Sequence, residues 1–144
     1  MTHQDAGHYA TKHPSGTKPN QKLIKAIKQK STDEKVSCVA LHKIATNLNF
    51  SPSEAGVVTD LLEYRLNKCQ LGLFGYSPQK AIVKPAINIP ADIKNLIDNK
   101  LENNRISCIA CWEIAQTLKI PKMDVSSVCE ALKIKITKCQ LGAF

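Results

Sequence analysis

An internal repeat constrains this chain more than any other feature of its sequence. Shifted by 70 residues, the chain matches itself without a gap, and 16 of the 55 residue pairs between 20–74 and 90–144 are identical. The longest identical run, Lys68-Cys69-Gln70-Leu71-Gly72, returns as Lys138-Cys139-Gln140-Leu141-Gly142. Two copies are too few for a solenoid, and a unit of this length alone buries too little surface. We therefore expect two similar units that pack together as a pseudo-symmetric pair.

Each copy is predicted to contain three helices followed by a strand. The first helices cover about residues 20–30 and 90–102, where apolar residues recur at helical spacing. The second helices begin after Ser37 and Ser107, which are good N-cap residues. The third helix of copy one begins with Ser51-Pro52-Ser53-Glu54, a capping box with proline at the first helical position.

The segments after the third helices alternate in polarity, which predicts strands over 68–74 and 137–144. Gly75-Tyr76-Ser77-Pro78 is a turn signal, and 81–84 is then a returning strand that would complete a hairpin, or wing. The resulting domain organisation is a mobile polar arm at 1–19, unit 1 at 20–84, a linker at 85–89 and unit 2 at 90–144.

Two short helices joined by a tight turn and followed by a strand resemble the helix-turn-helix and winged-helix superfamily. The resemblance is carried by Ile44-Ala45, Leu48, Phe50, Ala55 and Val58, and in copy two by Ile114-Ala115, Leu118, Ile120, Val125 and Val128. The turn of that superfamily usually holds glycine, where this chain has Asn49 and Lys119. The expected fold class is mainly α with small β: two repeated three-helix, winged-helix-like units, each ending in a short strand or hairpin.

The resemblance implies binding of double-stranded DNA, with the third helix in the major groove. In copy two, Lys122, Ser126, Ser127 and Lys133 would face outward and could contact phosphates or bases. The third helix of copy one offers Ser53 but is otherwise acidic, so we expect an asymmetric site read mainly by copy two. Lys22, Lys25 and Lys28 of the first helix, together with Lys30 at its end, would contact phosphates.

The charge of the chain agrees with an anionic partner. The net charge is +8, and residues 1–35 carry seven lysines against three acids. No apolar run is long enough to span a bilayer, and the N-terminus does not resemble a secretory signal. We therefore expect a cytoplasmic protein without a membrane partner, most simply a small transcriptional regulator of the bacterial type.

Cysteines offer a second hypothesis. Cys38, Cys69, Cys108 and Cys139 occupy repeat-equivalent positions, and four thiolates could hold Zn²⁺ or an iron–sulfur cluster in a sensor. Simple packing is the stronger interpretation, because free cysteine behaves as a small buried hydrophobe, and we therefore expect no cofactor. No nucleophile–base pair, phosphate loop or carboxylate pair indicates catalysis, so the chain is not predicted to be an enzyme.

Two alternatives remain open at this stage. The acidic third helix of copy one also suits a protein-interaction or assembly module, with a protein partner or a homodimer in place of DNA. The repeated Cys-Gln-Leu-Gly segment is either a pair of strands that meet across the pseudo-two-fold or a binding site. In the strand interpretation, Gly72 and Gly142 allow close backbone approach or a bulge, and Gln70 and Gln140 make matched polar contacts.

Overall fold

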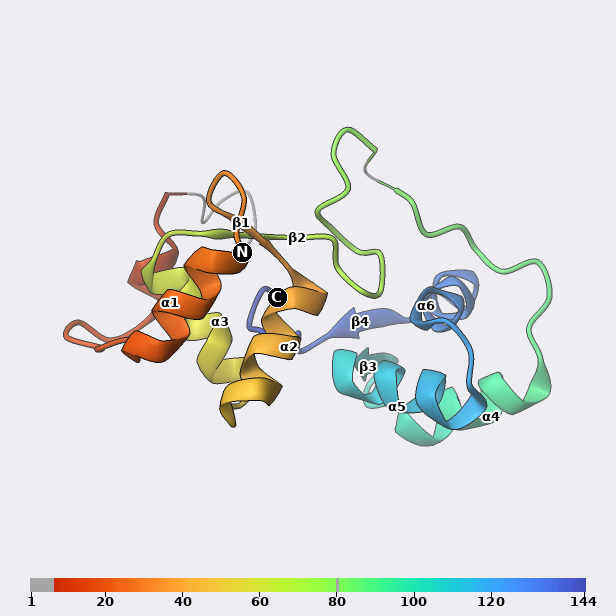
Figure 1. Cartoon of the computed structure of the whole chain (residues 1–144). Coiled ribbons are helices and arrows are strands. Elements are labelled where there is room, and N and C mark those ends of the chain that lie inside the picture. The colour runs from red at the N-terminus through yellow and green to blue at the C-terminus, as the bar shows by residue number, and fades with distance from the viewer. Residues whose placement is uncertain (1–6, 80) are drawn as a thin grey trace. The chain divides into compact units, whose positions relative to one another are not determined.

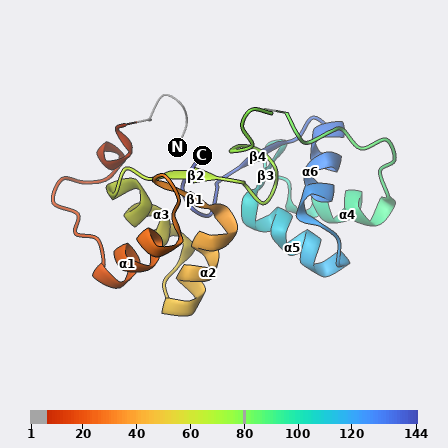
Figure 2. The same cartoon turned by 45° about the horizontal axis from the view of Figure 1, so that its top comes forward.

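The chain folds into two compact units, each built around three helices (Figures 1 and 2). The computed structural model describes residues 7–79 and 81–144. Unit 1 contains the described residues up to Cys69 together with Gln140–Phe144, and unit 2 contains Gln70–Cys139. The fold is mainly helical with a few short strands, and no helix within the described residues is both long and apolar enough to cross a membrane.

The two units repeat one order of elements: helix, strand, helix, helix, strand. Unit 1 also carries a short 3₁₀ helix, η2 (Tyr9–Lys12), ahead of this set. In unit 1 the repeated elements are α1 (Gln21–Lys30), β1 (Lys35–Ser37), α2 (Cys38–Leu48), α3 (Pro52–Leu61) and β2 (Arg65–Asn67). In unit 2 they are α4 (Ala91–Lys100), β3 (Arg105–Ser107), α5 (Cys108–Leu118), α6 (Lys122–Ala131) and β4 (Lys135–Thr137).

The predicted helices and their caps are confirmed. The Ser37 and Ser107 hydroxyls accept hydrogen bonds from the backbone N–H groups of Ala40 and Ala110, which begins α2 and α5. Both halves of the capping box at α3 are formed, with Ser51 and Glu54 each accepting from the other's backbone N–H. The apolar stripes of these helices form the core of each unit, including Leu23, Ile27, Leu41 and Ala55, then Ile93, Ile97, Ile114 and Val125.

The predicted long strands are wrong. The strands are three residues each and end at Asn67 and Thr137, and they pair in parallel, with Val36 opposite Leu66 and Ile106 opposite Ile136. The Cys-Gln-Leu-Gly segments that follow form turns. Residues 81–84 contain no strand, so the wing hairpin is not formed in the described part of the chain. The alternating burial of Cys69 and Leu71 arises because the segment packs against its unit, not because it belongs to a sheet.

The predicted unit boundaries also differ from the structure, since each unit ends in the other copy's segment. Copy one leaves unit 1 after Cys69, and its Gln70-Leu71-Gly72 belongs to unit 2. Copy two leaves unit 2 after Cys139, and its Gln140–Phe144 belongs to unit 1. We call residues 70–74 and 140–144 the exchanged tails. The repeat identifies this segment in the sequence but does not show which unit it packs against, because that depends on contacts between residues distant in sequence.

The two units also have similar backbone conformations at positions with positive φ. Left-handed residues recur at equivalent positions, as at Asn49 and Lys119, with φ of 61° and 56°. Both residues end the second helix of their unit, and their backbone N–H groups bond to carbonyls of the last turn. The turn predicted at these positions is therefore confirmed, with asparagine and lysine in the place that glycine usually takes.

Replacing Lys119 by glycine is expected to stabilise the protein. A left-handed residue with a side chain costs about 1–2 kcal/mol, and glycine avoids that cost while losing more entropy on folding. The expected gain is about 0.5–1 kcal/mol in the free energy of unfolding, measured by urea denaturation. The matched control is Lys43→Gly in the middle of α2, which should lose about 1 kcal/mol. A loss of stability in Lys119→Gly would contradict the assignment.

The N-terminal arm was predicted to be mobile over 1–19, but its described part from Gly7 onward is docked on α3. Tyr9 is buried, and the backbone N–H groups of Tyr9 and Ala10 donate to the two carboxylate oxygens of Glu63 at 3.0 and 2.8 Å. Asp60 accepts from Lys12 at 3.1 Å and from His13 at 2.7 Å. The acidic residues that made α3 a poor DNA-binding helix thus hold the arm. The first arm histidine, His3, lies outside the described residues.

The arm gives a second prediction. Glu63→Ala removes the acceptors of both arm N–H groups, so the amides of Tyr9 and Ala10 should exchange with deuterium about tenfold faster or more. Hydrogen–deuterium exchange followed by NMR measures this directly. Glu130→Ala is the matched control, because it removes an exposed acid from the end of α6, which holds no arm. Unchanged exchange in Glu63→Ala would show that the arm is held by other contacts.

Candidate nucleic-acid interface

The sequence analysis predicted that the third helices, α3 and α6, contact DNA, but much of each helix is buried. Gly56, Val58, Thr59 and Asp60 of α3 are buried, and so are the equivalent Ser126, Val128 and Cys129 of α6. The exchanged tails contribute to this burial: the backbone of Leu141 lies against Gly56 in unit 1, and Gly72 lies near the Met123 side chain in unit 2. Ser53 stays exposed near the start of α3. Neither helix presents the open outer face that entry into a major groove requires.

The four residues expected to contact DNA from copy two have different environments. The Lys122 ammonium lies 4.6 Å from the centre of the Trp112 ring, a cation–π contact. The buried Ser126 hydroxyl donates to the Lys122 carbonyl at 3.4 Å, and the half-buried Ser127 accepts from the Ala86 N–H through its carbonyl. Of the four, only Lys133 is exposed, and it lies beyond the end of α6. The structure therefore does not gather these side chains into one accessible face.

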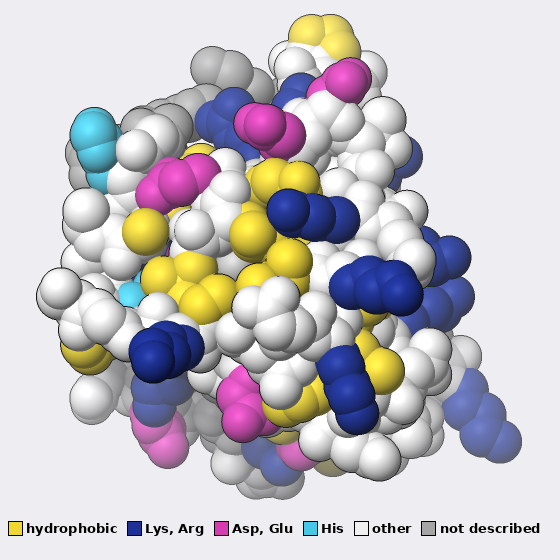
Figure 3. All heavy atoms as spheres, turned by 60° about the vertical axis from the view of Figure 1, so that its left-hand side comes forward, with side chains coloured by type: hydrophobic (Ala, Val, Ile, Leu, Met, Phe, Trp, Pro, Cys, Tyr) yellow, Lys and Arg dark blue, Asp and Glu magenta, His cyan; other side chains and the backbone are white. Residues whose placement is uncertain are grey.

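The predicted lysines of the first helix are all exposed, but they belong to one unit only. Lys22, Lys25 and Lys28 of α1 correspond to Asp92, Asn95 and Asp98 of α4, and Lys94 pairs with Asp98 at 2.8 Å. Figure 3 shows lysine, arginine and acidic side chains interspersed on the face that it presents, rather than one continuous basic patch. The repeat therefore does not preserve the charges of Lys22, Lys25 and Lys28.

A different set of cations is preserved in both copies. Of the eight basic residues in 20–74, only four have a basic counterpart 70 residues later, and all four lie in or beside the strand pair. All eight side chains of the two sets are exposed. We call them the strand-pair cations: Lys30, Lys35, Arg65 and Lys68 in unit 1, and Lys100, Arg105, Lys135 and Lys138 in unit 2.

The parallel strands bring these residues together. The register places Lys35 beside Arg65 and Arg105 beside Lys135. Because side chains alternate along a strand, the buried Val36 and Ile106 point inward while the cations point to solvent. Residues 30 and 68, and their equivalents, flank the strands at the end of the first helix and just after the last strand. The strand pairs thus bring Lys35 next to Arg65 and Arg105 next to Lys135, although the members of each pair are 30 residues apart in the sequence.

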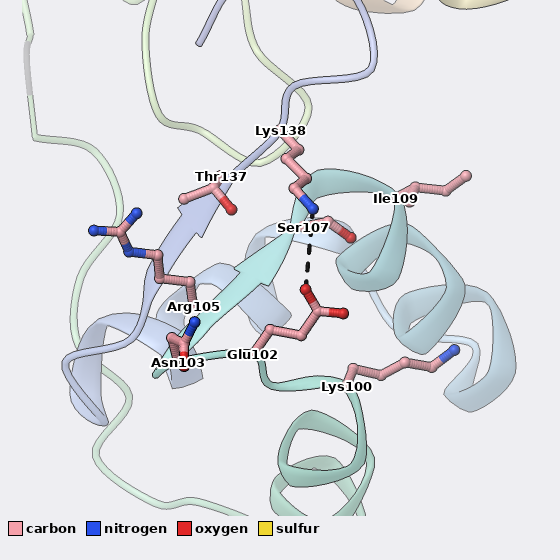
Figure 4. Close-up of a pocket in the computed structure, with 8 residues that line it drawn as sticks. All are labelled: Lys100, Glu102, Asn103, Arg105, Ser107, Ile109, Thr137 and Lys138. Atoms are coloured by element: carbon pink, nitrogen blue, oxygen red, sulfur yellow. Dashed lines mark ion pairs between the residues drawn. The ribbon is translucent and has the colours of Figure 1, made fainter.

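In unit 2 this surface is hollowed. A shallow pocket of about 810 Å³ is lined by three cations together with Ser107, Thr137 and Ile109 (Figure 4). Ser107 is also the N-cap of α5, so the helix begins beside the pocket. Figure 4 shows the Lys138 side chain reaching toward Glu102, while the Arg105 side chain extends away from that pair. Cations, hydroxyl groups and a nearby helix N-terminus are the groups that bind phosphate oxygens.

Acidic neighbours reduce this charge without cancelling it. Lys138 lies 4.0 Å from Glu102 and Lys100 lies 3.1 Å from Glu113, both as exposed surface pairs. Four cations against two glutamates leave a local charge of +2 in unit 2. In unit 1, Thr32 and Lys43 replace the two glutamates, and the acids nearby in sequence are Asp33 and Glu34. Five cations against two acids then give +3, so both surfaces are positive.

The structure divides the four repeat-equivalent cysteines between the two units. Cys38 and Cys69 belong to unit 1, Cys108 and Cys139 to unit 2, and within 7–79 and 81–144 no three histidine, cysteine or acidic residues are grouped so as to hold a metal. A hydrogen bond joins the Cys111 and Cys129 thiols on α5 and α6. This bond, helped by burial, raises the pKa of Cys111, and it lowers the pKa of Cys129 against the opposing effect of burial.

Thiol labelling should distinguish Cys139 from the other cysteines. Cys139 is half-buried and the other five cysteines are buried, so one thiol per chain should react quickly with Ellman's reagent. The rest should react about a hundredfold more slowly, because each must wait for local opening. Cys139→Ser should remove the fast phase. A fast phase that persists in this variant would show that a buried thiol is more accessible than the structure implies.

Comparison with protein-family models, with curated proteins and with solved structures finds no significant match to this chain. The assignment of a site therefore depends on the residues themselves. Apart from Lys30, the sequence analysis missed the strand-pair cations, because it summed charge over segments instead of comparing charge at equivalent positions. The signal was present: Lys22 and Lys28 become aspartate in copy two, while Lys30 and Lys68 stay lysine.

Proposed function

We propose that this protein binds double-stranded DNA, and that it does so through the strand-pair cations of both units. The observation that carries the proposal is their preservation as charges, while the other four basic residues of 20–74 have acidic or neutral counterparts. A core is preserved by packing, but exposed lysines need no preservation for folding. Equivalent exposed cations on two units instead suit a ligand that presents the same chemistry twice, as the phosphates of a duplex do.

The chemistry of the surface supports backbone contact more than base recognition. Lysine and arginine beside Ser107 and Thr137 match the donors that commonly contact phosphate oxygens. The third helices are covered, so direct major-groove recognition by Lys122 or Ser126 is not part of this proposal. Each unit is on this view a variant of the helix-turn-helix fold that kept its core and turn and moved its contact surface to the strands. Binding should then depend strongly on salt and weakly on sequence.

Neutralising one set of strand-pair cations should weaken DNA binding. In the variant Lys100→Gln, Arg105→Gln, Lys135→Gln, Lys138→Gln, up to four phosphate contacts are lost, so the salt dependence should become shallower by about 3 in the slope of log K against log [salt]. The affinity should fall by at least about a hundredfold at low salt, because each contact contributes a fraction of a decade or more. Fluorescence polarisation with a labelled 30-base-pair duplex measures both quantities.

The matched control removes the same charge elsewhere. Lys22→Gln, Lys25→Gln, Lys28→Gln, Lys119→Gln also loses four exposed lysines, none of which has a basic counterpart. The proposal expects this control to lose much less affinity than the strand-pair variant. Equal loss in both would show that binding follows total charge alone. Absence of salt-dependent binding by the unmodified chain, together with a protein that co-purifies with it, would favour the assembly-module alternative.

A further inference from the structure

The exchanged tail of unit 1 fills a site whose shape depends on one glycine. A Cβ atom at Gly56 of α3 would overlap the carbonyl oxygen of Leu141 and would lie 2.8 Å from its carbonyl carbon. Leu141 and Ala143 are buried, at 2% and 4% exposure. Lys12 closes the site from the arm, because its ammonium donates to the Gly142 carbonyl at 3.2 Å while also contacting Asp60 of α3. Glycine is thus required where the tail backbone meets the helix.

The occupant of this site is a short segment supplied by the other copy. Residues 140–144 belong to unit 1, whereas the chain up to Cys139 belongs to unit 2. The equivalent exchange places Leu71, which is fully buried, in unit 2. Both tails begin with the same Gln-Leu-Gly, which is part of the longest run that the repeat keeps identical. Unit 1 therefore contains a segment, residues 140–144, that comes from the second copy of the repeat.

The tail sites of the two units are not equivalent. Gly56 corresponds to Ser126, which is buried and carries a side chain where Gly56 has none. In unit 2 a cavity of about 220 Å³ remains next to Leu73 of the tail, lined also by Ser126, Cys129 and Ile134. In unit 1 the tail backbone contacts the helix directly. The unit 1 site is therefore the tighter of the two and the better candidate for binding a detached segment.

We propose that the Gly56 site of unit 1 is a peptide-binding site that also accepts its segment in trans, and that its partner is residues 140–144 of a second copy of this chain. The contacts that hold the tail include its backbone against Gly56, the buried Leu141 side chain and the Gly142 carbonyl, and the same five residues of a second chain would offer the same groups. The tail of the same chain has a high effective concentration at the site, so the protein should stay monomeric as long as its own tail can bind. When it cannot, two chains should join by tail exchange.

Complementation between two full-length variants tests this. The donor is Gly56→Ala, which closes its own site and leaves its tail intact but displaced. The acceptor is Leu141→Asp, which keeps an open site and has a tail that cannot be buried. Each variant alone should be a folded monomer by circular dichroism and light scattering. Mixed, they should form a one-to-one complex of twice the 15.9 kDa of a single chain.

Two controls make the result specific. The double variant Gly56→Ala, Leu141→Asp should not complement the acceptor, because its tail cannot be buried. Unmodified protein should not complement the donor, because its site is already filled. In addition, a fluorescent peptide with the sequence of residues 137–144 and serine at the position of Cys139 should bind the acceptor. It should bind about tenfold more weakly, or worse, when the acceptor also carries Gly56→Ala.

The peptide experiment keeps the proposal falsifiable if the donor does not fold, and Leu141→Ala serves as a milder acceptor. A mixture that stays monomeric, together with a peptide that binds neither acceptor, would overturn the proposal. So would a complex that forms equally well with the double variant, since tail exchange could not then be its cause. None of these outcomes depends on DNA, so the proposal is independent of the function assigned above.

Discussion

The structure depends on the closure of each third helix by a segment that arrives from the other copy. A three-helix unit of this size buries little of its surface. Without the tail, the residues of the third helix that the tail covers would be exposed to solvent. In unit 1 the contact is as close as backbone against backbone, at Gly56 and Leu141. This closure explains the identity of the Cys-Gln-Leu-Gly runs. Leu141 and Gly142 must satisfy one site while Leu71 and Gly72 satisfy its counterpart, so neither run is free to drift as the aliphatic core residues are.

The covering of α3 and α6 also determines which polar side chains remain accessible to a ligand. Once α3 and α6 are covered, the polar residues on their outer positions take structural tasks: Asp60 and Glu63 hold the arm, and Ser126 bonds within its own helix. The exposed charge that both copies share lies instead beside the strands, where no tail passes over Lys35 or Arg105. The side chains accessible to a ligand therefore lie beside the strand pairs rather than on the buried faces of α3 and α6.

Local patterns predicted local structure well. The helix starts were predicted correctly from Ser37, Ser107 and the Ser51–Glu54 capping box, because a helix cap forms hydrogen bonds only within the first four residues. The alternation after β2 and β4 was misleading, because burial of every second residue also results when a turn packs against a helix. The tail exchange and the clustering of the strand-pair cations could not be predicted in the same way, since both depend on contacts between residues that are distant in sequence. The candidate site was predictable only in its overall positive charge.

The exchange of tails has a consequence for how the protein loses its structure. A chain of two ordinary domains can unfold one domain and keep the other, because each contains all of its own core. Here, melting of unit 2 would free the segment from which unit 1 draws Leu141, and melting of unit 1 would free Leu71 from its place in unit 2. Neither unit has an intact folded state in which the other is fully disordered. We therefore expect the unfolding of the two halves to be coupled, so that a destabilising change in one half also lowers the stability of the other.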